Sequence, residues 1–132
     1  MPVSFERMRI GEQYTRPQLA DLWGYEGYEA ISRGIVTPAG THFVILFITR
    51  EKQLCHPQYE DVFDGRVLRI EGEMNHAADR RLVEAAVNGD EIHLFYRERH
   101  HASFTYEGRW RLRDHQIAVN QPSRFTFALS KG

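Results

Sequence analysis

The sequence is short of the residues that stabilise secreted and membrane proteins. Cys55 is its single cysteine, which excludes an internal disulfide and a cysteine-based zinc site but leaves an intermolecular bridge open. The longest apolar run, Phe43 to Ile48, is too short to span a bilayer. The N-terminus lacks the basic and then apolar layout of a signal peptide. We therefore expect a cytoplasmic protein with no membrane association.

An excess of charge of either sign is also lacking. The 17 basic and 18 acidic residues give a net charge of −1, so no overall field favours the coating of nucleic acid. Phosphate binding depends instead on where the charges lie. Arginine outnumbers lysine 15 to 2. This ratio suits bidentate contacts to phosphate and guanine, although a GC-rich genome produces the same bias.

Catalytic and metal-binding motifs are missing as well. The sequence contains no HExxH, no GxSxG, no Walker loop and no nucleotide-binding glycine fingerprint, and its seven histidines are scattered. Asp61, Glu71 and Glu73 imitate the carboxylates of a nuclease, but the Glu-x-Lys that should accompany them is absent. We predict a protein that is not an enzyme and that needs no metal and no cofactor.

What is present predicts one domain over residues 1–132, with a helical N-terminal segment (1–34) and a β-rich core (35–132). Thr15 is a suitable N-cap, Pro17 falls in the first turn, and Gly24 ends this helix. A second helical turn over 25–34 would give residues 15–34 a helix-turn-helix pattern, which is one reading of this segment. The other reading is that its apolar residues plug one end of a barrel; these residues are Leu19, Leu22, Trp23 and Ile31.

Strand patterns dominate the rest of the chain, and a single helix interrupts them. Strands are predicted at 35–36, 41–49, 67–71, 91–97, 103–112, 116–120 and 125–129, and a helix that Asp79 caps ends at Asn88-Gly89. The strand at 41–49 is apolar on both faces, so we expect it to be central and buried. This succession is typical of an α+β domain with a strongly bent or barrel-like sheet that is mostly antiparallel.

Two motifs carry a family resemblance. Residues 59–65 read Tyr-Glu-Asp-Val-Phe-Asp-Gly and residues 106–112 read Tyr-Glu-Gly-Arg-Trp-Arg-Leu, and Gly34-Ile35 matches a Gly-Ile pair ahead of them. Together they resemble SRA domains, also called SAD or YDG domains. The resemblance implies a PUA/SRA-like curved antiparallel β-barrel that binds double-stranded DNA and reads a modified base of the 5-methyl- or 5-hydroxymethylcytosine class by base flipping. In modification-dependent restriction endonucleases such domains work with a nuclease, so a nuclease domain or subunit is the implied partner.

The resemblance also implies a pocket for the flipped base. Tyr59 would stack on the base and Asp61 would accept from its exocyclic amine; as alternatives, Tyr59 packs at the barrel rim and Asp61 stabilises a turn. Ile70 stands where the family has a second stacking tyrosine, and only Met74 to Ala77 remains of the family's long finger. Three aromatic residues near the predicted first helix are candidates to replace the lost stack: Trp23, Tyr25 and Tyr28.

Contacts to the DNA backbone are predicted for the polar residues around this pocket. The loop between two strands carries the densest basic run, and its alternative role is a solvated hairpin tip. The candidates are Arg33, Asn75, His76, Arg97, Arg99, His100 and His101. Two other functions stay open at this point. A helix-turn-helix binder would place residues 25–33 in the major groove, and a plain protein interaction domain would have no affinity for nucleic acid.

Overall fold

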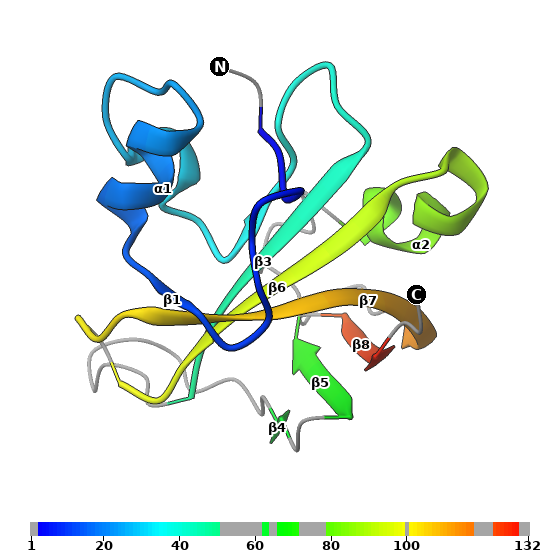
Figure 1. Cartoon of the computed structure of the whole chain (residues 1–132). Coiled ribbons are helices and arrows are strands. Elements are labelled where there is room, and N and C mark those ends of the chain that lie inside the picture. Colours follow the sequence, from blue (N-terminus) through cyan, green and yellow to red (C-terminus); the bar gives the residue numbers. More distant parts are fainter. Residues whose placement is uncertain are drawn as a thin grey trace.

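The chain folds around one bent sheet with a helix on each side (Figure 1). A computed structural model describes residues 3–50, 62–63, 66–71, 79–99, 101–117 and 123–129, of which 62, 63 and 71 by their backbone alone. The elements are β1 (Gln13–Tyr14), α1 (Arg16–Leu22), the 3₁₀ turn η1 (Glu29–Ile31), β2 (Ile35–Val36), β3 (Phe43–Thr49), β4 (Val62–Phe63), β5 (Val67–Glu71), α2 (Asp79–Asn88), β6 (Glu91–Arg97), β7 (Phe104–Gln116) and β8 (Arg124–Leu129).

Seven strands follow one another in the order β2-β3-β6-β7-β8-β5-β4, and β1 pairs with β7 outside this path. The α+β class that the sequence predicts is confirmed. The neighbours pair antiparallel except β3 and β6, which are parallel with Phe43 opposite Glu91. Among the described strands the sheet ends at β2 and at β4, so it curves without closing into a barrel.

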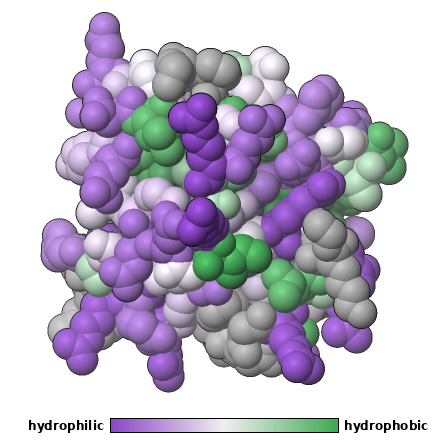
Figure 2. All heavy atoms as spheres, in the orientation of Figure 1, coloured by the Kyte–Doolittle hydropathy of each residue, from purple (hydrophilic) through white to green (hydrophobic). Residues whose placement is uncertain are grey.

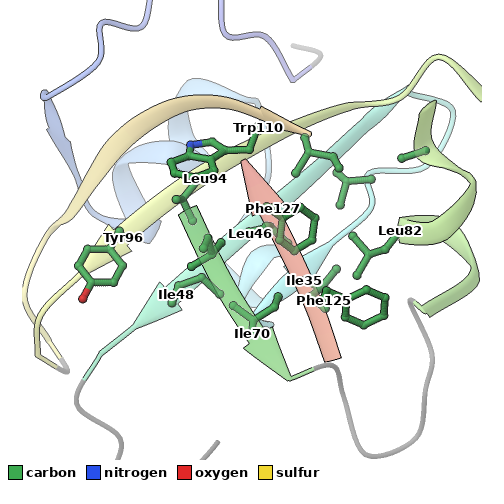
Figure 3. Packing of buried hydrophobic residues seen from close by; sticks show 14 residues of the cluster. Ile35, Leu46, Ile48, Ile70, Leu82, Leu94, Tyr96, Trp110, Phe125 and Phe127 are labelled. Atoms are coloured by element: carbon green, nitrogen blue, oxygen red, sulfur yellow. The ribbon is translucent and has the colours of Figure 1, made fainter. Parts of the chain in front are cut away.

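The concave face of the sheet holds the larger core. Its residues come from β2 and β3 near one end of the sheet, from β5 and β8 near the other, and from α2, so the sheet wraps around them. Figure 3 shows Leu46, Leu94 and Phe127 meeting in its middle. β3 also supplies Ile45 and Phe47 to a second core on the convex face, so it is buried on both sides as predicted.

The convex face is covered over β3 and β6 by the N-terminal segment and α1 (Figure 1). α1 begins with a capping box in which the Thr15 hydroxyl accepts from the Gln18 amide and the Gln18 side chain accepts from the Thr15 amide. Gly24 follows the helix with φ 79°, a conformation that glycine adopts without strain. Leu19 is fully buried, so α1 presses its apolar side into the convex core.

α2 is fastened to the sheet at both ends by polar contacts. The Ser123 hydroxyl, next to β8, donates to the Asp79 carboxylate at 2.6 Å where the helix begins. Arg81 donates to both carboxylate oxygens of Asp90 at 2.8 and 3.2 Å, just before β6 begins. Asp90 is buried. The two parallel hydrogen bonds from the Arg81 guanidinium to its carboxylate form in one relative orientation only, so they fix the position of α2 relative to the start of β6.

Two sequence predictions differ from the structure. Residues 25–34 contain only the three-residue turn η1, because Gly27 and Gly34 interrupt a helical pattern too short to nucleate; a helix-turn-helix reader with a recognition helix here is therefore wrong. The strand that was predicted to start at Gln116 does not start there. Gln116 is the last residue of β7, which is long enough to pair with β6, β8 and β1. None of the described helices has the length and apolar character to cross a membrane.

Candidate nucleic-acid interface

Arg97, the last residue of β6, is held in place on three sides. Its Nε donates to the Thr49 hydroxyl at 2.8 Å, and its Nη1 donates to the carbonyl of Ala102 at 3.4 Å. Its guanidinium carbon lies 4.3 Å from the centre of the Phe104 ring, a cation–π distance. The planar fork of arginine is therefore oriented before any ligand arrives.

A second arginine reaches the same ring from the start of α1. The guanidinium carbon of Arg16 lies 5.0 Å from the centre of Phe104 and 4.8 Å from that of Phe47. Its Nε donates to the carbonyl of Ile31 at 2.9 Å, and its Nη2 to the carbonyl of Arg33 at 3.3 Å. We call Arg16, Arg97, Thr49 and Phe104 the basic corner.

The basic corner holds two positive charges without a carboxylate. Burial and, to a smaller extent, the charge of Arg97 lower the pKa of Arg16 to about 10. Burial also lowers the pKa of Arg97. Both groups stay protonated at neutral pH, and within the described ranges neither forms an ion pair with an acidic side chain. An anion such as phosphate would supply the missing negative charge.

The β6–β7 hairpin beside the basic corner carries the other predicted backbone contacts. The Arg50 amide donates to the Arg97 carbonyl at 2.9 Å, and the Arg50 guanidinium pairs with Glu98 at 3.2 Å on the surface. Arg99 and His101 are exposed, and His101 has φ 67°. His100 lies outside the described residues. The structure thus brings Arg97, Arg99 and His101 together, with Arg97 half-buried and the other two at the tip.

Arg33 joins the same region from a different part of the chain. Its carbonyl accepts from Arg16, so its backbone lies beside the basic corner, and its side chain is exposed. Asn75 and His76, the two other predicted backbone contacts, lie outside the described residues. Their role stays a prediction.

The residues proposed for the base pocket do not gather at one place. Tyr59 and Asp61 lie outside the described residues. Ile70 is 2% exposed. Figure 3 shows it among the residues of the concave core. Trp23 is also 2% exposed, in the convex core, where its Nε1 donates to the Ser4 carbonyl at 3.1 Å. Trp23, Leu19 and Ile31 are buried as the plug reading predicts, but they cover the convex face of an open sheet, and Leu22 is 46% exposed, so the prediction of a barrel plug is wrong in these two respects.

Tyr25 and Tyr28 lie on the outer side of α1. Together they line a surface hollow of about 420 Å³. Tyr28 is 49% exposed, and Tyr25 packs in part against the convex core. The carboxylates of Asp21 and Glu26 line the same hollow, and this negative charge opposes a nearby phosphate. Tyr25 thus shares the convex core with Trp23, whereas Ile70 lies in the concave core on the other face of the sheet.

A buried histidine network under the N-terminal segment was not anticipated. His93 is 4% exposed and stacks on Phe5 with ring centres 3.6 Å apart. Its Nε2 donates to the Glu91 carboxylate at 3.0 Å, so in the neutral ring Nδ1 accepts from the Tyr106 hydroxyl at 2.7 Å. Burial lowers the pKa of His93, and burial together with the charge of Glu91 raises the pKa of Tyr106 to about 12.

Sequence reasoning also missed Arg16 and Thr49. An arginine in the first turn of a helix has no motif of its own, and its position over Phe104 follows from packing between residues far apart in the chain. The alternation of β6, which puts Arg97 on the same face as His93 and Phe95, is a signal that could have assigned Arg97 to the convex side. Within the described part of the chain, no three His, Cys, Asp or Glu side chains come close enough to hold a metal ion.

Comparisons with known proteins place the fold. No protein-family model and no curated protein matches the sequence. Among solved structures, the SRA domain of SUVH5 in complex with fully methylated CG DNA matches with a TM-score of 0.63 and 10% identity, over 100% of this chain and 95% of that one. The DNA modification-dependent restriction endonuclease AspBHI matches with a TM-score of 0.54 and 16% identity, over 89% of this chain and 71% of that one. The fold is therefore SRA-like, as the two sequence motifs predict.

Proposed function

We propose that this protein reads modified bases in double-stranded DNA. The observation that carries the proposal is the basic corner on an SRA-like fold, where two half-buried guanidiniums are oriented and lack an acidic partner among the described residues. The similar SRA domain was solved with methylated DNA, and the similar endonuclease depends on DNA modification, which supports the same ligand here.

The division of labour follows from the two kinds of contact. Arg16 and Arg97 bind phosphate oxygens, which fixes the position of the duplex but carries no sequence information. Discrimination then falls to Tyr59, which stacks on the extruded base, and to Asp61, which accepts from its exocyclic amine. Stacking on one aromatic ring contributes about 1–3 kcal/mol, close to the cost of unstacking the base.

Ile70 determines how well flipping is compensated. It is buried in the concave core and offers no aromatic ring. The base therefore stacks on Tyr59 alone, whereas the family provides two stacking tyrosines. We infer a modest affinity and a preference for a base whose modification adds polar contacts, such as 5-hydroxymethylcytosine over 5-methylcytosine. Each added hydrogen bond contributes about 0.5–1.5 kcal/mol.

The protein acts as a reader and leaves cleavage to a nuclease domain or subunit in the cytoplasm. The polar character of the surface favours a charged ligand such as DNA and not an apolar protein partner. Figure 2 shows polar residues over most of the face crossed by the N-terminal segment, with hydrophobic residues in separate small groups. Phosphate is the anion that a duplex offers most densely.

A binding panel tests this function. Short duplexes that differ at one cytosine (unmodified, 5-methyl or 5-hydroxymethyl), with an N6-methyladenine duplex beside them, are titrated against the protein at two salt concentrations. We expect the modified cytosines to bind at least about tenfold more tightly, roughly 1.4 kcal/mol. Equal affinity for all four duplexes would overturn the proposal.

Flipping is tested separately with 2-aminopurine placed beside the modified position. An extruded base leaves its neighbours unstacked, so we expect the fluorescence of 2-aminopurine to rise on binding. Tyr59→Ala should abolish this rise and Tyr14→Ala, at a tyrosine outside the predicted pocket, should preserve it. Tight and selective binding without a rise would mean that the modification is read inside the groove.

A further inference from the structure

A second basic surface lies on the half of the convex face that the N-terminal segment leaves bare. Residues of a strand alternate between the two faces of a sheet. Leu68, Ile70, Trp110, Phe125 and Phe127 lie in the concave core, so their neighbours on β5, β7 and β8 point to the convex side. Four of these neighbours are arginines, and we call them the arginine face: Arg69, Arg109, Arg111 and Arg124.

The arginine face is exposed and has little to neutralise it. All four side chains are exposed, and none forms an ion pair within the described part of the chain. Two acidic residues are in register with this surface, Asp114 opposite Thr126 and Glu71 opposite Arg124, and the Oδ1 of Asp114 accepts from the amide of His115. Four arginines against two acidic residues leave this surface with an excess of positive charge.

The side chains between the arginines decide which ligand fits. Thr126 lies opposite Arg69, and Ala128 lies opposite Arg111, so short residues of β8 separate the arginines of β5 and β7. Protein interfaces rely on central aromatic or aliphatic anchors, and Thr126 and Ala128 offer none. A shallow surface with spaced guanidiniums instead matches the sugar–phosphate backbone of a nucleic acid.

The arginine face lies apart from the basic corner. Phe104 and Arg111 are seven residues apart on β7, roughly 20 Å at 3.3 Å per residue. The sheet wraps around the concave core, so the two halves of its convex face point in different directions. DNA has a persistence length of about 150 base pairs and resists following such a bend.

We infer that the arginine face binds the backbone of a second DNA segment, so that one molecule holds two segments at once. This inference adds a site to the proposed reader, and it does not depend on which base the reader recognises. Because the contacts are to phosphates, the second segment is bound without regard to sequence or modification, and the binding weakens steeply with salt.

A two-duplex capture assay tests the inference. A modified duplex on beads is saturated with protein and washed, and a fluorescent unmodified duplex is then added at about 50 mM salt, where phosphate contacts are strong. Wild-type protein should retain the second duplex, with sedimentation giving two duplexes per protein molecule. The variant Arg69→Gln/Arg111→Gln/Arg124→Gln should lose at least about tenfold of this capture and keep its affinity for the first duplex within about twofold.

A matched variant controls for the change in net charge. Arg7→Gln/Arg9→Gln/Arg80→Gln removes three exposed arginines elsewhere, so it should capture the second duplex like the wild type. Absence of capture by the wild type, or equal loss in both triple variants, would overturn the inference. Equally tight binding of poly-glutamate would assign the face to an acidic protein and overturn it as well. Loss of discrimination between modified and unmodified first duplexes, with capture of the second intact, would instead overturn the proposed reader.

Discussion

The covered and bare halves of the convex face show what burial does to the same residue types. Under the N-terminal segment and α1, the side chains of Arg16, Arg97 and His93 have fixed partners and lowered pKa values. On the bare half, Arg69 and Arg111 extend into solvent from the same face of the sheet. A buried cation is held in one orientation, and the loss of its partners costs free energy because the charge is then buried without compensation. An exposed cation attracts a ligand by its charge, and salt screens this attraction.

Removing the covered cations should have the largest effect. Arg16→Ala with Arg97→Ala should weaken binding to every duplex by roughly 100-fold, because each charged hydrogen bond contributes about 1.5–3 kcal/mol. Fluorescence anisotropy over a salt series measures the loss of affinity. The slope of the logarithm of the binding constant against the logarithm of the salt concentration should become less steep by the contribution of about two phosphate contacts. Arg80→Ala, at an exposed arginine of α2, is the control. An unchanged salt slope would remove the basic corner from the interface.

Removal of the Phe5 ring should expose His93 to solvent, as the side chains on the bare half are exposed. Phe5 stacks on the His93 ring, so Phe5→Ala should cost about 2 kcal/mol of unfolding free energy, less than a fully buried phenylalanine. The pKa of His93 should then rise towards its ordinary value, because burial is what lowers it. NMR titration of the His93 ring follows the pKa. A pKa that stays low in Phe5→Ala would mean that burial by Phe5 is not its cause.

Acid should destabilise the covered half. The pKa of His93 is lower in the folded than in the unfolded chain, so its contribution to stability is complete above about pH 6.5 and is lost as pH falls below that value. The melting temperature should decrease between pH 7.5 and 5.5, and less so in His93→Gln once its lower starting stability is subtracted. The exposed His115→Gln is the control and should follow the wild type. If the melting temperatures of the wild type and of His93→Gln decrease with pH by the same amount, protonation of His93 is not the cause of the acid destabilisation.

The smallest effect is expected where the two halves meet. Gly108 sits at a register shift in β7 with φ 86°, so Gly108→Ala should cost about 1–2 kcal/mol in backbone strain. An added Cβ would also lie 2.8 Å from Cδ1 of Ile10, which is 68% exposed and can turn away. Gly40→Ala, with φ 72° and open space, is the matched control. A much larger loss at Gly108 than at Gly40 would show that Ile10 cannot move.

Local signals made much of the fold predictable from sequence. β5 and β6 occupy the predicted residues, and α1 begins at the predicted Thr15 cap, because turn residues and side-chain alternation mark these boundaries. β1 was missed because two residues carry no pattern of their own and form a strand by pairing with β7. The parallel pairing of β3 and β6 was missed because a strand that is apolar on both faces does not reveal its neighbours.

The candidate site was less predictable for the same reason. Arg97 was found because it belongs to a basic run, whereas Arg16 becomes part of the site through its place over Phe104. Trp23 was expected near a base and lies in the core, since an aromatic residue on an apolar helix face is most stable when buried. The roles of Tyr59 and Asp61 remain predictions from the motif.

The parallel pair of β3 and β6 also sets the order in which this chain can fold. Thr49 and Arg97 are bonded across the pair although 48 residues separate them, and Asp79 and Ser123 are bonded across 44. The two loops interlock, because Asp79 lies inside the first and Arg97 inside the second. β3 pairs locally with β2 and β6 pairs locally with β7, but β3 and β6 meet only when the long loop between them closes, and this closure precedes most of the stabilisation from burial. Folding in milliseconds to seconds, with β3 and β6 protected late from hydrogen exchange, is the kinetic signature of such a topology.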